Sequence, residues 1–145
     1  MNTEVIKNGQ VLPEEIDALR LAVGWNTLGD DYEKILKKAY ADYTVRDDHG
    51  SLIGYLAIIS DGVADAFLID LVVHPSFQRT GLGERIVRTA IYDMKQAGIH
   101  CVQVTFEDHL EPFYRKCGFH IFKGGIIDFK HMAWPHDAGP DDTPE

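Results

Sequence analysis

The stretch that decides the fold reads Leu71-Val72-Val73-His74-Pro75-Ser76-Phe77-Gln78-Arg79-Thr80-Gly81-Leu82-Gly83-Glu84. A hydrophobic strand ends at Pro75, a short loop follows, and Gly81 and Gly83 open an amphipathic helix. This arrangement points unpaired backbone N–H groups and the positive end of a helix at one spot. Because glycine lets a bulky anion approach the backbone, the stretch predicts a binding site for a phosphate or pyrophosphate group.

Two common phosphate-binding patterns do not fit this loop. A Walker loop would need Gly-Lys followed by Ser or Thr, which the sequence lacks. A dinucleotide fingerprint would need three glycines and an acidic residue about 20 positions further on, within repeated strand-helix-strand units. Arg79 adds a positive charge to the loop, and Arg85 and Arg88 lie near the same end. A Gly-x-Gly pattern alone is equally typical of a tight turn.

The elements on either side of the loop predict one mixed α/β domain. Strands are expected near residues 4–10, 42–47, 51–59, 64–73, 100–106, 119–123 and 126–133. Helices are expected from Pro13 to Gly24, from about Asp30 to Tyr40, from Gly81 to Ala97 and from Glu111 to Lys116. The strands at 42–73 form an antiparallel meander, and the strand, helix and strand between 64 and 106 imply a parallel pair.

Composition limits the classes of function. A chain of 145 residues buries one good core, and its net charge of −9 argues against general binding of nucleic acid. No apolar run is long enough to span a bilayer, and Met1–Glu4 does not resemble a secretory signal. Cys101 and Cys117 suggest no disulfide framework, so we expect a cytoplasmic protein without membrane association. The histidines show no metal-ligand spacing, and no metal is predicted.

The last residues differ from the rest of the chain. Pro135–Glu145 contains four acidic residues and one small apolar residue, so burial cannot offset the entropy of ordering it. The sequence therefore predicts one domain over residues 1–134, followed by a flexible acidic tail over residues 135–145.

Two motifs resemble the GNAT superfamily of N-acetyltransferases. Gln78–Gly83 matches the superfamily's Gln/Arg-x-x-Gly-x-Gly/Ala signature, and Ile69–Pro75 resembles its fourth strand. Pro112–Phe119 resembles its Phe-Tyr-x-x-x-Gly-Phe segment, in the same order and at similar spacing. The resemblance covers roughly residues 4–133. It implies the acyl-CoA N-acyltransferase fold, in which a central, mostly antiparallel sheet of about six or seven strands carries about four helices.

The resemblance also implies acetyl-CoA as the cosubstrate, lying where the fourth and fifth strands separate. Main-chain groups of the fourth strand would pair with its pantetheine arm, and the loop amides would hold its pyrophosphate. The implied cofactor-binding residues are Leu71, Val72, Val73, Gln78, Arg79, Thr80, Gly81, Leu82, Gly83, Glu84 and Tyr114. The main-chain donor at Val73 is the natural group to polarise the thioester carbonyl.

Direct transfer of an acetyl group to an amine needs two proton events. The ammonium must lose a proton before it attacks, and the departing thiolate must gain one. Tyr114 stands at the superfamily's tyrosine position and is the predicted general acid. Asp70 on the fourth strand and Glu107, where the superfamily often has asparagine, are both candidates for the base. Trp25, Tyr32 and Tyr40 lie where an acceptor pocket is expected.

The leading hypothesis is an N-acetyltransferase that acts on a primary amine of a small molecule or peptide, by direct attack in a ternary complex. The alternatives are a non-catalytic, acyl-CoA-binding regulatory module and a different nucleotide-binding protein. A homodimer, formed by exchange of the last strands or by edge pairing, is compatible with the sequence, which does not establish one.

Overall fold

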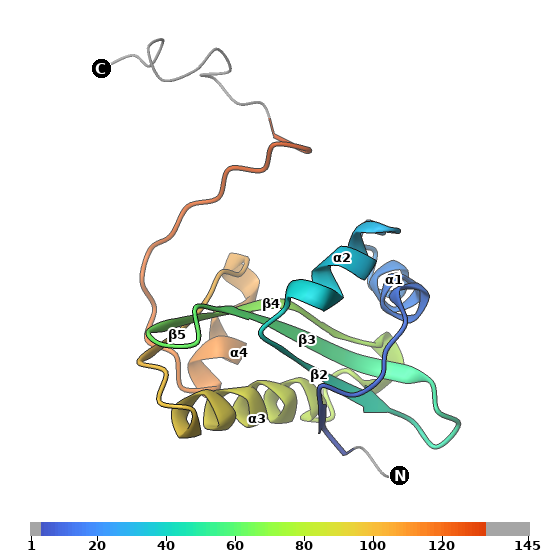
Figure 1. The fold of residues 1–145 in the computed structure, drawn as a ribbon, viewed down its shortest axis with the longest axis horizontal. Coiled ribbons are helices and arrows are strands. Elements are labelled where there is room, and N and C mark those ends of the chain that lie inside the picture. The colour runs from blue at the N-terminus through green and yellow to red at the C-terminus, as the bar shows by residue number, and fades with distance from the viewer. Residues whose placement is uncertain (1–3, 133–145) are drawn as a thin grey trace.

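The computed structural model describes residues 4–132, and one five-stranded sheet lies between two layers of helices (Figure 1). The strands, in spatial order, are β1 (Ile6–Lys7), β2 (Ala41–Arg46), β3 (Leu52–Ser60), β4 (Asp65–Val73) and β5 (Cys101–Val104). The helices are α1 (Pro13–Ala22), α2 (Asp31–Lys38), α3 (Leu82–Gln96) and α4 (Glu111–Lys116), with 3-10 turns η1 (Pro75–Phe77) and η2 (Asp108–Leu110). Neighbours from β1 to β4 are antiparallel and β4–β5 is parallel, which confirms the predicted mixed α/β fold.

Each face of the sheet has its own hydrophobic core, because the strands place alternate side chains on opposite faces. On the face of α1 and α2, the buried side chains include Ile16, Leu19, Tyr32, Leu52, Tyr55, Ala57 and Val72. On the opposite face, α3 contributes the predicted apolar stripe, which includes Leu82, Ile86, Val87, Ala90 and Met94. The helix predicted over residues 81–97 is thus confirmed, and Gly98, with φ of +82°, follows its end.

The fourth strand changes register in its middle. Tyr55 pairs with Val72, whereas Ala57 pairs with Ile69, so β4 holds one more residue than β3 across this step. The extra residue is a β-bulge, and Asp70 within it has φ of +59°, which is the left-handed region. Bulges bend a strand and increase its twist, so the course of β4 changes here.

Two predicted strands are absent from the described residues. Residues 119–123 and 126–132 form no strand, and the sheet therefore has five strands instead of the predicted six or seven. After α4 the chain continues without strand or helix (Figure 1), and its described end turns at residues 129–132 and contacts Asn26 and Asp31 through His131 and Lys130. Strand propensity alone does not form a ladder, because a strand needs a partner for its backbone groups. The predicted acidic tail, residues 135–145, lies outside the described residues.

Among residues 4–132, no helix has both the length and the apolar character needed to cross a membrane.

Close packing of α3 on β3 leads to a test of the core. A Cβ atom placed on Gly54 would lie 2.8 Å from Cδ1 of Ile86, which is itself fully buried. We expect Ile86→Ala to lower the free energy of unfolding by about 2–5 kcal/mol, because it leaves a cavity against Gly54. Urea denaturation measures the change. Tyr92→Ala, an exposed position on the same helix, should stay within about 0.5 kcal/mol. Equal losses in both variants would contradict this packing.

Candidate functional site

The parallel strands β4 and β5 run together for only part of their length. They pair from Asp65 opposite Cys101 to Leu68 opposite Val104, where β5 ends while β4 continues to Val73. The last five residues of β4 therefore have β3 on one side and no strand of the described chain on the other. This is the separation of the fourth and fifth strands that the family resemblance implied.

The directions of the backbone N–H and C=O groups in β4 determine which of them face this open side. The N–H of His74 donates to the carbonyl of Ile53 on β3, at 2.8 Å. Because successive residues of a strand turn their backbone groups to opposite sides, the N–H of Val73 points to the open side. The Val73 carbonyl accepts a hydrogen bond from Nε2 of Gln78 at 3.0 Å, which ties the loop after β4 to the strand. The strand end thus presents a main-chain donor beside the glycine loop.

The glycine loop leads directly into α3. Arg79 and Gly81 both have positive φ, +63° and +85°, and the hydroxyl of Thr80 donates to the carbonyl of Phe77 at 2.6 Å. Space around Gly81 is open, because a Cβ atom added there would have no described atom within 4 Å beyond its chain neighbours. The first N–H groups of α3 have no carbonyl partner within the helix, so they are available to an anion.

Side-chain charges near the loop are largely engaged with one another. Glu84, in the first turn of α3, contacts Arg88 at 3.0 Å and Lys116 at 3.4 Å. The hydrogen bond from Arg88 lowers the pKa of the Glu84 carboxyl. Arg88 also donates to the carbonyl of Lys116 at 2.7 Å and so joins α3 to α4. Arg79 has no ion pair with a described residue, so it is the arginine best placed to meet an anion.

Helix α4 brings the predicted tyrosine to the same place. The ring of Phe113 lies 3.4 Å from a Cβ position on Gly83, so α4 packs directly on the start of α3. Tyr114 is 5% exposed and stacks on Phe106, with ring centroids 4.6 Å apart. Burial raises the pKa of Tyr114 to about 12, so its hydroxyl stays protonated at neutral pH. Residues of β4 and α4 therefore meet at Gly83, in the first turn of α3.

Asp70 is held by two side chains from the helical layer above it. Its Oδ1 lies 3.1 Å from Nη1 of Arg20, and its Oδ2 accepts a hydrogen bond from the Tyr32 hydroxyl at 3.1 Å. Arg20 also donates to the Tyr32 oxygen, at 3.1 Å, and its guanidinium lies 5.1 Å from the ring centre of Trp25. Desolvation, followed by the charge of Asp70, raises the pKa of Tyr32. Both carboxylate oxygens of Asp70 are thus engaged.

Glu107 has quite different surroundings. It follows β5 and precedes η2, its side chain is 85% exposed, and its one described ion-pair contact is His109 at 3.5 Å. The two predicted base candidates are therefore a paired carboxylate under α1 and an open carboxylate beyond β5.

Predicted site residues fall into two groups. The structure brings the end of β4 beside the start of α3, where Phe113, the neighbour of Tyr114, also packs on Gly83. The side chain of Asp70 instead contacts Arg20 and Tyr32, and Glu107 is exposed after β5. Sequence reasoning missed Arg20, which fixes Asp70. The signal was present, because Arg20 stands one helical turn after Ile16, on the buried stripe of α1, where a charged residue needs a partner.

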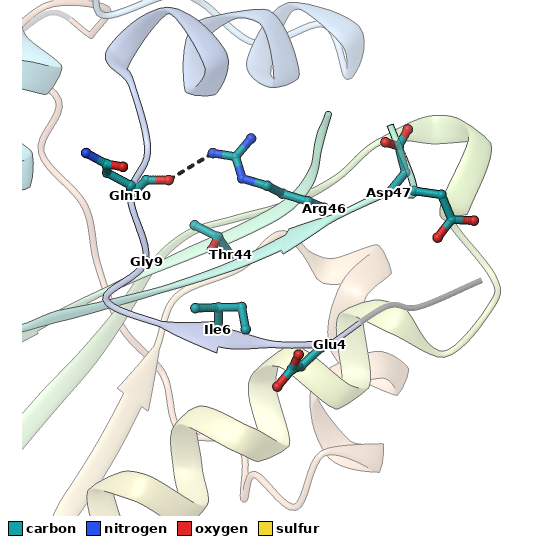
Figure 2. Close-up of a pocket in the computed structure, with 8 residues that line it drawn as sticks. Glu4, Ile6, Gly9, Gln10, Thr44, Arg46 and Asp47 are labelled. Carbon is teal, nitrogen blue, oxygen red and sulfur yellow. Dashed lines mark hydrogen bonds between the residues drawn. The ribbon is translucent and has the colours of Figure 1, made fainter. Parts of the chain in front are cut away.

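A separate surface hollow of about 520 Å³ lies at the far edge of the sheet, beside β1 and β2 (Figure 2). Arg46 lines it and is already engaged, since it pairs with Glu15 and donates to the carbonyls of Gln10 and Gly50. Figure 2 shows the contact with Gln10. Because Arg46 already has partners and the acidic residues Asp47 and Asp48 also line the hollow, this site does not suit an anionic ligand.

Comparisons with known proteins agree with this geometry. The model of the acetyltransferase (GNAT) family matches residues 13–119. An uncharacterised N-acetyltransferase of Pyropia yezoensis is 33% identical over 89 residues, which are 61% of this chain and 49% of that protein. The chain spans about half the length of the first curated relatives it matches.

Solved structures give the same family. A GNAT family acetyltransferase of Streptococcus pneumoniae has a TM-score of 0.76 at 28% identity, over 90% of this chain and 100% of that one. A GNAT family N-acetyltransferase of Escherichia coli, solved in complex with CoA, has a TM-score of 0.66 at 20% identity, over 83% and 71% of the two chains.

The paired Asp70 yields a prediction for stability. Arg20→Met leaves a largely buried carboxylate without its cation, and we expect it to lower the free energy of unfolding by about 1–3 kcal/mol. Adding Asp70→Asn should recover part of this loss, with a coupling energy of about 0.5–3 kcal/mol in a double-mutant cycle. Arg115→Met, which breaks an exposed pair with Glu111, is the matched control and should cost less than about 1 kcal/mol. Strictly additive losses would exclude the pairing.

Proposed function

The chain belongs to the acetyltransferase (GNAT) family, and we propose that it transfers the acetyl group of acetyl-CoA to a primary amine of a small molecule or peptide. The observation that carries the proposal is that the Val73 N–H points away from β3 and lies beside the first turn of α3, whose N–H groups have no partner within the helix. A cytoplasmic location and the absence of nucleic-acid and membrane partners remain predictions of the sequence.

Main-chain donors suit a polyanionic cosubstrate in this protein. Coenzyme A carries several negative charges, and the chain has a net charge of −9, so binding needs a local group of donors. Backbone N–H groups of the loop over residues 79–84 would hold the pyrophosphate, with Arg79 beside them. Main-chain groups of Leu71 and Val73, on the open side of β4, would pair with the pantetheine arm in the manner of an added strand, with Val72 between them. The CoA complex of the Escherichia coli neighbour supports this choice of ligand.

The transfer step is a direct attack in a ternary complex. The amine nitrogen forms a bond to the thioester carbonyl carbon, and the carbon–sulfur bond then breaks to release the CoA thiolate. The Val73 N–H would stabilise the charge that develops on the carbonyl oxygen. A free thiol has a pKa of about 8.5, whereas the pKa of Tyr114 is about 12. Full transfer of the tyrosine proton to the thiolate would therefore be unfavourable. Tyr114 therefore acts by donating a hydrogen bond to sulfur as its charge develops, and the proton that the attacking nitrogen loses as the amide forms passes through solvent to the thiolate.

For the base we favour Glu107 over Asp70. Asp70 could accept a proton only after its contacts with Arg20 and Tyr32 were broken, whereas the Glu107 carboxylate is open to solvent. Glu107 could take the ammonium proton through a water molecule. Asp70 then has a positioning role, because its pairing fixes the bulge of β4.

Ligand binding tests the proposal. We expect acetyl-CoA and CoA, but neither ATP nor NAD, to raise the melting temperature, because a ligand that binds only the folded state stabilises it. Gly81→Val should abolish this rise, since the new side chain would occupy the loop and strain its positive φ. Gly50→Val is the matched control, because Gly50 likewise has a positive φ, +81°, and open space around it, but lies in a remote turn. A rise that survives Gly81→Val would contradict the loop as the binding site.

Catalysis is tested separately with Tyr114→Phe. The expected result is a loss of turnover of about 10²-fold, at the lower end for a proton-donating side chain, with unchanged affinity for acetyl-CoA. Thiol release with a panel of primary amines gives the rate, and Tyr92→Phe, at an exposed position, is the control. An unchanged rate would remove Tyr114 from the reaction. If acetyl-CoA binds but no amine releases thiol, the alternative of a non-catalytic acyl-CoA-binding module is favoured.

A further inference from the structure

The hydroxyl of Tyr114, which is expected to donate to the departing sulfur, is not oriented by a hydrogen bond within residues 4–132. Burial is the main cause of its raised pKa and the thiol of Cys117 is the second, and no hydrogen bond to a described residue contributes. A tyrosine ring can rotate about its side-chain bonds unless neighbouring atoms prevent it. The direction of the hydroxyl therefore depends on what packs against the ring.

Three phenylalanine rings surround the ring of Tyr114. Phe106 stacks on its face, with ring centroids 4.6 Å apart and ring planes inclined by 19°. Phe113 and Phe119 meet Tyr114 nearly at right angles, with centroids 4.9 Å and 5.7 Å away. Stacked and edge-on pairs are both arrangements that aromatic rings prefer. Because only Phe106 lies parallel to the tyrosine, it is the neighbour that opposes tilting of the tyrosine plane.

Phe106 reaches this place because the alternation of β5 continues beyond the end of the strand. The strand ends at Val104, yet exposed and partly buried side chains alternate from residue 101 to residue 107, and Phe106 is one of the partly buried ones. Val102 and Val104 pack against the core on the α3 side of the sheet, so Phe106 points to that side too. Helix α4, which carries Tyr114, lies on the same side.

The stacked pair stands apart from the hydrophobic cores of the described chain. Phe113 and Phe119 pack against the core on the α3 side and attach α4 to it. Neither Phe106 nor Tyr114 belongs to that core or to the core under α1 and α2, as far as residues 4–132 show. Replacing Phe106 should therefore disturb Tyr114 while leaving both cores in place.

We propose that Phe106 is a positioning residue for acetyl transfer, which aims the hydroxyl of Tyr114 at the thioester sulfur by stacking on the tyrosine ring. This inference rests on the proposed function. Phe106 is the second residue after the end of β5, so the stack ties Tyr114 to the place where β4 and β5 separate. Holding the donor in one direction matters because a small misplacement of a reacting group lowers the rate strongly.

The rate of thiol release tests this role. Phe106→Leu keeps an apolar side chain but removes the ring, and we expect it to lower turnover about tenfold with unchanged affinity for acetyl-CoA. In the Tyr114→Phe background the same substitution should change the rate by less than about twofold, because the hydroxyl that Phe106 positions is already gone. Phe106→Tyr, which keeps the ring, should retain most of the rate.

Phe67→Leu is the matched control, since Phe67 is 39% exposed and lies near the start of β4, away from Val73. It should keep the full rate. Full turnover in Phe106→Leu, or an equal loss with and without the Tyr114 hydroxyl, overturns the proposal.

Ring motion of Tyr114 gives a readout that needs no substrate. In a chain with ¹³C-labelled tyrosine rings, the signals of Tyr114 are those that disappear in Tyr114→Phe. A ring held by a stacked neighbour flips slowly, so its two Cε positions should give separate or broadened signals, which merge into one sharp signal in Phe106→Leu. Identical signals in both chains would contradict the holding of Tyr114 by Phe106. If no amine releases thiol, the proposed function fails, and these signals still decide whether Phe106 fixes the tyrosine.

Discussion

The pairing of Arg20 with Asp70 is the interaction on which the site depends. Asp70 occupies the left-handed region inside a strand, a conformation that is costly for a residue other than glycine unless its surroundings hold it there. Arg20 and Tyr32 engage both carboxylate oxygens from the helical layer, and so fix the bulge of β4. Beyond the bulge β4 continues past the end of β5, and this places an outward N–H at Val73 beside the start of α3.

An acidic protein with this geometry can bind a polyanion mainly through its backbone. Glu84 pairs with both Arg88 and Lys116 and so links α3 to α4, and these charges contribute to architecture more than to attraction of a ligand. The donors that remain are N–H groups, whose positions follow from the positive φ of Arg79 and Gly81. Phe113 packs on Gly83 and thereby brings Tyr114 to the same place.

Local patterns predicted most of the fold and located the glycine loop before α3, whereas the roles assigned to the site residues stay predictions. Helix α3 and the parallel pair of β4 and β5 were predicted because hydrophobic periodicity and glycine positions are properties of neighbouring residues. The pairing of Arg20 with Asp70 was not predicted, because it joins residues far apart in sequence and depends on where α1 packs. Residues 119–132 have strand-like composition, but composition does not say which edge a strand will join.

The most direct test of the account is a titration of the ¹⁵N-labelled chain with CoA, followed by the backbone amide resonances. The account predicts the largest shifts at residues 71–73 and 79–84, with little change at Thr44 and Arg46 beside β1. Shifts confined to the hollow at Thr44 and Arg46, or spread evenly over the chain, would contradict it.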